Sequence, residues 1–178
     1  MRNVLNDIDI CRIKGIDQPV LPLWVYGTLR TDGKYHYYLV DCSAKVGEYQ
    51  MRGTLMQMVS GDVFLRKDGS DRLTTGELYR VSLAGLWRIF HLENQSGSFP
   101  KAYDLAVSEV FETATNTMGV ALWFRRREEE ALPCQDYNSH KTLLEILVEY
   151  IQQAQQGLTQ NDIDSFLRQQ LTKPAHSA

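Results

Sequence analysis

The stretch that decides the fold is LPLWVYGTLRTDGKYHYYL, residues 21–39, in which an apolar run stops at a glycine. The run predicts a strand over Leu23–Tyr26, and Gly27 lets the backbone turn sharply and come close to a ligand. Successive N–H groups of such a turn can point into one concavity and bind an anion. With the Thr28 hydroxyl and the Tyr26 ring beside it, the turn predicts a small anion-binding loop. A plain strand-to-helix turn is the alternative.

The composition describes an ordinary globular chain. It has 178 residues, a net charge of −3 and a pI near 5.8. This charge argues against non-specific binding of nucleic acid, which usually needs a basic surface. No apolar run is long enough for a membrane span, and the charged N-terminus does not fit a signal peptide. Cys11, Cys42 and Cys134 are odd in number and far apart, so we expect free thiols in a reducing compartment and a cytoplasmic protein.

The order of elements predicts an α+β fold, a small and strongly curved sheet or barrel of five or six strands with helices against it. Capping residues mark two helices: Ser82 begins one that runs to Glu93, and Thr159 with Asp162 forms a capping box. The remaining expected elements are a short helix in residues 34–43, strands near Thr54–Val59, Val63–Arg66, Thr75–Val81, Tyr103–Phe111 and Val120–Phe124, and a helix that begins at Asn138 or Ser139 and stops before Gly157.

The chain divides into three expected parts. Residues 1–20 form an N-terminal leader, residues 21–130 the main domain, and residues 131–178 a C-terminal helical pair packed on it. The sequence contains no P-loop, no G-x-G-x-x-G after a strand, no H-x-x-x-H, no zinc spacing and no G-x-S-x-G. We therefore expect no metal and no cofactor.

Glu93 occupies an unusual position for a carboxylate. Helical spacing places it on the apolar side with Leu86, Ile89 and Phe90, at a C-terminus where the helix dipole disfavours an anion. Partial burial and the dipole would both raise its pKa toward neutrality, which suits a general base. The alternative is a frayed helix end with Glu93 in solvent. Glu77 and other strand carboxylates are expected to point outward.

An ordered set of motifs resembles the gamma-glutamylcyclotransferase-like (AIG2-like) family. The set covers roughly residues 22–125, and the tail is similar to the C-terminal part of the animal enzymes. The matching motifs are V-Y-G-T-L-R at Val25–Arg30, His36 and Leu39, V-G-E-Y at Val46–Tyr49 followed by Gly53, G-E-L-Y at Gly76–Tyr79, I-F-H-L-E at Ile89–Glu93, Tyr103, and the strand Val120–Phe124.

The resemblance implies a small mixed β-barrel with flanking helices and a cofactor-independent cyclotransferase. The loop Tyr26, Gly27, Thr28 and Leu29, with Tyr103, would bind a γ-glutamyl group, and Glu93 would act as the base. The amine of that group would attack its own γ-carbonyl and release 5-oxoproline with a free amine. The implied partner is a small γ-glutamyl molecule, without nucleic acid or membrane, and a homodimer is compatible with the sequence.

Two departures from the family pattern concern the substrate pocket. Phe90 replaces the aspartate of L-D-x-x-E, and Leu105 replaces an arginine two residues after the tyrosine. Trp24, Tyr35, Phe99 and Trp123 are candidate pocket walls, although each is also a natural core residue. A non-catalytic binding or regulatory module that keeps the fold is the second reading. A nucleophilic enzyme using Cys42 with His36 or His91 is a third, supported by residue types alone.

Overall fold

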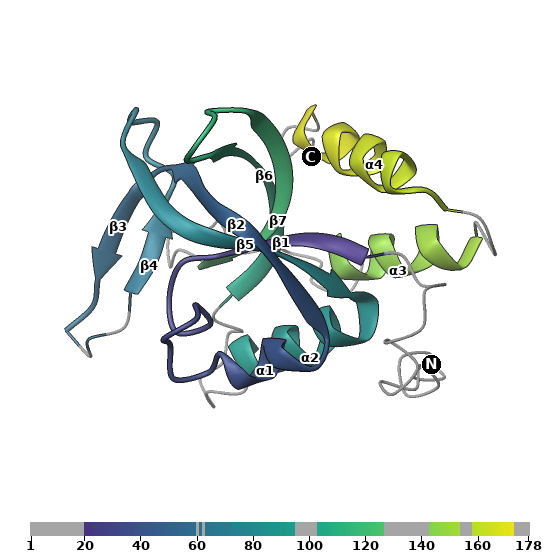
Figure 1. Cartoon of the computed structure of the whole chain (residues 1–178), viewed down its shortest axis with the longest axis horizontal. Helices are drawn as coiled ribbons and strands as arrows, with labels where there is room; N and C mark the ends of the chain where they lie inside the picture. Colours follow the sequence, from purple (N-terminus) through teal and green to yellow (C-terminus); the bar gives the residue numbers. More distant parts are fainter. Residues whose placement is uncertain are drawn as a thin grey trace, which may run out of the picture.

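The computed structural model describes residues 20–59, 61, 63–94, 103–126, 143–153 and 158–172. Within them the elements follow one another along the chain as Figure 1 shows. Their bounds are β1 Val20–Val25, α1 Tyr37–Val40, β2 Ser43–Arg52, β3 Thr54–Gln57, β4 Val63–Arg66, β5 Leu73–Ser82, α2 Leu83–Asn94, β6 Tyr103–Glu112, β7 Met118–Arg126, α3 Leu143–Gln153 and α4 Gln160–Thr172.

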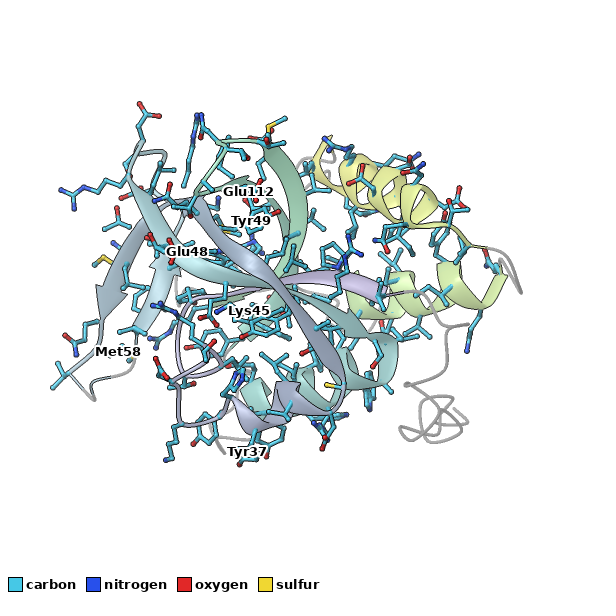
Figure 2. The ribbon with its side chains drawn as sticks, in the orientation of Figure 1. Tyr37, Lys45, Glu48, Tyr49, Met58 and Glu112 are labelled. Carbon is cyan, nitrogen blue, oxygen red and sulfur yellow. The ribbon has the colours of Figure 1, made fainter. Side chains whose placement is uncertain are left out.

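Five strands close into a mixed barrel in the order β1-β5-β2-β6-β7. All neighbours pair antiparallel except β1 and β7, which meet in parallel at Leu23 and Leu122. The pairing of Tyr49 with Glu112 joins β2 to β6 (Figure 2). Closure removes the exposed sheet edges that an open sheet of this size would leave. The α+β barrel predicted from the sequence is therefore confirmed.

The hairpin β3–β4 forms a separate two-stranded sheet beside the barrel (Figure 1). It is attached through Leu65, which is 2% exposed and packs in a cluster with Trp24, Met51 and Trp123. The backbone N–H of Leu65 also donates a 3.1 Å hydrogen bond to the hydroxyl of Tyr26. This hairpin therefore lies against the end of β1, where the glycine loop begins.

Both faces of β1 and β7 are buried over most of their length, which explains the nearly continuous apolar runs in these two strands. On β1, Leu21 and Leu23 join the large cluster that includes the helices, whereas Trp24, which points to the opposite face of the strand, joins the smaller cluster. α2 contributes Leu86 and Ile89 to the large cluster. The remaining helical members are Leu39, Leu83, Phe90, Leu144, Leu147, Ile163, Phe166 and Leu167.

The predicted helix caps are present. The hydroxyl of Ser82 accepts a 3.0 Å hydrogen bond from the N–H of Gly85 at the start of α2. At the start of α4, the Asp162 carboxylate accepts hydrogen bonds from the N–H and the hydroxyl of Thr159, and the Thr159 hydroxyl accepts one from the N–H of Asp162. The first cap fixes the helix whose opposite end carries Glu93.

The short helix expected in residues 34–43 is present as α1, which is a single turn. The ten-residue strand β2, which begins at Ser43, was not predicted from the sequence. A register shift between Lys45 and Gly47 interrupts its pairing with β5. The two-residue period of this strand is hard to see in the sequence, because its residues are mostly polar. The bulge also reverses which side chains point to which face of the sheet. The predicted start at Asn138 or Ser139 and the stop at Gly157 lie outside the described residues.

Candidate active site

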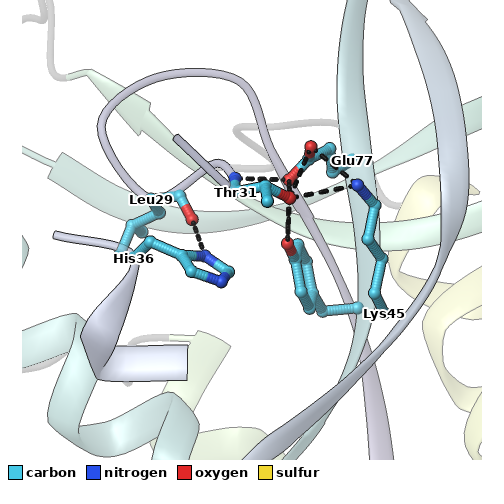
Figure 3. A network of polar contacts seen from close by, with 6 residues as sticks. Leu29, Thr31, His36, Lys45 and Glu77 are labelled. Carbon is cyan, nitrogen blue, oxygen red and sulfur yellow. Dashed lines mark hydrogen bonds and ion pairs between the residues drawn. The ribbon is translucent and has the colours of Figure 1, made fainter. Parts of the chain in front are cut away.

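Hydrogen bonds accepted by its carbonyl groups stabilise the turn of the glycine loop after β1. The carbonyl of Gly27 accepts from the N–H of Arg30 at 3.1 Å, and the carbonyl of Thr28 accepts from the N–H of Tyr35 at 2.9 Å. Nδ1 of His36 lies 3.0 Å from the carbonyl oxygen of Leu29, so the tautomer protonated at Nδ1 donates to it (Figure 3). All three carbonyl groups are thus engaged within the loop.

The N–H groups of the same three residues are not engaged. No backbone N–H of Gly27, Thr28 or Leu29 donates to any residue that the structure describes. Consecutive unpaired N–H groups in a turn are the donors that hold an anion in a backbone nest. The three N–H groups are therefore available to a ligand, and the anion-binding role stays a prediction.

Gly27 itself is not required by the backbone. Its φ is not positive, and a Cβ built there would meet only Cγ2 of Val63 at 3.7 Å, an ordinary contact. By contrast, a Cβ at Gly33 would lie 2.0 Å from the carbonyl oxygen of Thr28. Since the described protein leaves room for a side chain at residue 27, the space beside Gly27 is open to a ligand.

A buried carboxylate fixes the far half of the loop to the barrel. The Glu77 carboxylate accepts hydrogen bonds from the N–H of Thr31 at 2.8 Å and from its hydroxyl at 2.9 Å (Figure 3). It also accepts from Nζ of Lys45 and from the hydroxyl of Tyr79, each at 2.8 Å. These contacts join the loop to β5 and β2.

The position of Glu77 corrects an expectation. Its side chain was expected to point outward, but Glu77 is only 6% exposed and shares a face of β5 with Tyr79 and Val81. Burial alone would raise the pKa of Glu77, but hydrogen bonds from Lys45, Tyr79 and Thr31 outweigh it and lower the pKa to about 2. Glu77 is therefore ionised at neutral pH. Sequence periodicity missed it because the loop, not another strand, covers this face.

A pocket of about 280 Å³ opens beside the loop. Its lining combines the glycine backbone with charged side chains. The residues that line it are Tyr26, Gly27, Arg30, Asp32, Gly33 and Glu77. Of the predicted site residues, Tyr26 and Gly27 face this pocket, whereas Thr28 is exposed and Leu29 is buried in the core, 4% exposed.

Glu93 lies in the last turn of α2 and is half-buried, not in solvent as a frayed end would be. Burial raises the pKa of Glu93 to about 7. The carboxyl group is thus divided between its acid and base forms near neutral pH, as a general base requires. Glu93 is not among the residues that line the pocket beside Gly27.

Tyr26 connects Glu93 with the loop. Burial raises the pKa of Tyr26 well above its usual range, and the charges of Tyr103 and Glu93 raise it further. Both groups are therefore close enough to act on the Tyr26 hydroxyl, which also donates a 3.4 Å hydrogen bond to the carbonyl of Phe124. The charges of Glu93 and Tyr103 thus act on Tyr26, which lies at the start of the glycine loop.

Most of the aromatic candidates belong to the core. Trp24 and Trp123 are each 1% exposed, so they do not form pocket walls. Tyr35 packs partly buried against the large cluster, and Phe99 lies outside the described residues. Phe90, which replaces the family's aspartate, is 7% exposed and packs with its ring centroid 6.4 Å from that of Phe124.

The nucleophilic cysteine reading finds no support in the structure. Cys42 is buried and free, burial raises the pKa of its thiol, and Sγ donates to the carbonyl of Tyr38 at 3.1 Å. No contact joins Cys42 to His36 or His91 in the residues that the structure describes. Across those same residues, no cluster of His, Cys, Asp and Glu could hold a metal ion, and no helix could span a membrane.

A second cavity of about 300 Å³ contains none of the predicted site residues. It lies at the ends of β2 and β6 and beside α4. Its lining residues are Arg52, Lys67, Ser108, Glu109, Phe111 and Leu171. The two pockets share no lining residue, so this cavity is separate from the pocket beside the glycine loop.

These features define a class of protein: a small closed β-barrel with a glycine loop after its first strand and a half-buried glutamate at the end of a neighbouring helix. The family model "Gamma-glutamyl cyclotransferase, AIG2-like" matches residues 23–140, more than half of the chain. The chain therefore belongs to the gamma-glutamyl cyclotransferase, AIG2-like family. No curated protein matches it significantly.

One solved structure shares the fold, and two others are similar at lower TM-scores. An AIG2-like protein from Mus musculus is 17% identical, with a TM-score of 0.53, and the match covers 71% of this chain and 88% of that one. YkqA from Bacillus subtilis is 22% identical, with a TM-score of 0.48, over 61% of this chain and 36% of its own length. The uncharacterized protein PH0828 from Pyrococcus horikoshii is 23% identical, with a TM-score of 0.45, over 61% and 80% of the two chains.

Proposed function

We propose that this protein converts a γ-glutamyl amino acid or a γ-glutamylamine to 5-oxoproline and a free amine, with Glu93 as the general base. One observation carries the proposal most directly. Burial raises the pKa of the Glu93 carboxyl group to about 7, and its charge acts on Tyr26, which begins a loop whose N–H groups at Gly27, Thr28 and Leu29 donate to no residue that the structure describes.

The loop would hold the α-carboxylate and backbone of the γ-glutamyl group, because consecutive N–H groups stabilise a carboxylate. Glu93 takes a proton from the α-ammonium, and the neutral amine attacks the γ-carbonyl carbon of the same molecule. A carbon–nitrogen bond forms to close the five-membered ring. The γ-amide bond breaks as Glu93 gives its proton to the departing nitrogen. The ring nitrogen then loses its second proton to the departing amine, which leaves as an ammonium ion.

The reaction is intramolecular, so holding one flexible chain in the reactive conformation supplies much of the rate enhancement. Donors of the loop would also stabilise the negative charge that develops on the γ-carbonyl oxygen. Tyr26 and Tyr103 form walls of this site, and the hydroxyl of Tyr26 is already engaged with Leu65 and Phe124. No cofactor enters these steps. We place the activity in the cytoplasm.

A non-catalytic binding or regulatory module is the second candidate. It is favoured by Phe90, which places an apolar ring in the core where the family has an aspartate, and by Leu105, which is 7% exposed and also apolar. In that case the loop would bind a carboxylate ligand, and Glu93 would transfer no proton.

Release of 5-oxoproline from a panel of γ-glutamyl amino acids and γ-glutamylamines tests the proposal. Turnover of any member supports the cyclotransferase and identifies the amine that departs. A folded protein that binds members of the panel without releasing 5-oxoproline supports the non-catalytic module.

A further inference from the structure

Arg30 is a cationic residue that lines the pocket beside Gly27 and directly follows the three residues with unpaired N–H groups. Its Nε is buried and has no hydrogen-bond partner. No hydrogen bond or ion pair joins its guanidinium to any other residue that the structure describes. A buried guanidinium nitrogen without a partner is costly, because its N–H loses water without gaining an acceptor.

The nearest buried carboxylate is not available to Arg30. Glu77 lines the same pocket, but its two oxygens already accept from Thr31, Lys45 and Tyr79. A carboxylate has about four acceptor positions, and these donors fill them. Lys45 also balances its charge at 2.8 Å. The Glu77 network therefore holds the loop while leaving Arg30 unpaired.

The other acid of the pocket does not neutralise Arg30 either. Asp32 is exposed, and no ion pair connects it with Arg30. A planar guanidinium offers several donors in a fixed arrangement that matches the two oxygens of a carboxylate. A pair of anionic oxygens would therefore suit Arg30 as a partner.

We propose that Arg30 binds a carboxylate of the ligand through its guanidinium, as a side-chain anchor in addition to the backbone N–H groups of the loop. This inference takes one element from the proposed function, namely that the ligand is a γ-glutamyl compound. The carboxylate comes from one of two sources, the α-carboxylate of the γ-glutamyl half or the carboxylate of the departing amino acid.

Binding measurements by calorimetry separate the two sources. Wild type and Arg30→Gln are compared with 5-oxoproline and with its neutral amide. The intact ligands γ-glutamylalanine and γ-glutamylethylamine, which differ in one carboxylate, are measured in the Glu93→Gln background so that they are not consumed. Arg30→Lys keeps the charge, and Arg80→Gln removes the same charge from an exposed position of β5.

We expect Arg30→Gln to weaken binding of a carboxylate ligand about tenfold to a hundredfold. Arg30→Lys should recover part of this loss, and Arg80→Gln should show none. A loss for 5-oxoproline but not for its amide assigns the α-carboxylate. A loss for γ-glutamylalanine but not for γ-glutamylethylamine or 5-oxoproline assigns the departing carboxylate.

Three results would overturn the inference: unchanged binding of every ligand by Arg30→Gln, equal loss for charged and neutral ligands, or no binding of any carboxylate ligand by wild type. The proposed function fails separately. If wild type releases no 5-oxoproline but binds carboxylates through Arg30, the enzyme is rejected and the anchor remains. If turnover that depends on Glu93 occurs and Arg30→Gln binds every ligand as wild type does, the cyclotransferase is supported and the Arg30 anchor is rejected.

Discussion

The backbone N–H of Thr31 donates a 2.8 Å hydrogen bond to the carboxylate of Glu77, which ties the loop after β1 to the middle of β5. The same carboxylate receives Lys45 from β2, so two barrel strands and the loop meet at one buried charge (Figure 3). A site that must orient a flexible substrate benefits from such support, because loosely held donors lose catalytic precision.

Replacing Glu77 by Gln should lower the free energy of unfolding at pH 7 by about 1–3 kcal/mol. The folded pKa of about 2 lies below the usual 4.5, so this stability is present above pH 4.5 and is lost as the pH falls toward 2. Urea unfolding across this range measures it. A wild-type protein whose stability is flat between pH 4.5 and 2, or matches the variant at every pH, contradicts the prediction.

The Glu93 carboxyl group should change the stability of the protein with pH in the direction opposite to that of Glu77. Its folded pKa of about 7 lies above the usual 4.5, so its contribution is complete below pH 4.5 and disappears as the pH rises through 7. Glu93→Gln should therefore be more stable than wild type at pH 8, by an amount on the order of 2 kcal/mol, and equal to it near pH 4. Thermal unfolding at both pH values provides the test. A variant that is less stable than wild type at pH 8 would contradict the raised pKa of the Glu93 carboxyl group.

Gly27→Ala should fold with little change in melting temperature, since its Cβ would meet only Val63 at 3.7 Å. It should nevertheless reduce release of 5-oxoproline at least about tenfold, because the methyl group enters the space of the ligand. Gly33→Ala is the contrasting control, because a Cβ there would lie 2.0 Å from the Thr28 carbonyl oxygen and should destabilise the loop. Full activity in a folded Gly27→Ala would show that the ligand does not approach this glycine.

Tyr26→Phe tests the connection between the loop and the hairpin β3–β4. The change removes the acceptor of the Leu65 N–H and the donor to the Phe124 carbonyl. We expect a loss of about 1–2 kcal/mol and faster hydrogen exchange at Leu65. Unchanged exchange in the hairpin would mean that the hydroxyl does not hold it.

The sequence predicted the parts of the fold in which local chemistry and tertiary packing agree. Ser82 and the pair Thr159 and Asp162 cap the helices as expected, and the apolar runs of β1 and β7 became barrel strands. Glu93 stood out because a carboxylate on an apolar helix face breaks a local rule.

What the sequence did not predict depends on contacts between distant segments. β2 escaped because a bulge after Lys45 breaks its alternation, and Glu77 escaped because the covering element is a loop 46 residues away in sequence. The unpaired state of Arg30 follows from the saturation of Glu77, which no local pattern encodes. Such features arise only when the barrel closes.

The most direct test of the central claim is the pH dependence of 5-oxoproline release by wild type and Glu93→Gln, measured on the panel member that turns over best. The account predicts that kcat/KM of wild type rises with pH through an apparent pKa near 7, as Glu93 loses its proton. Glu93→Gln, folded and with ligand binding retained, should lose at least about a thousandfold. A variant that keeps wild-type turnover with the same pH profile would contradict the role of Glu93 as the base.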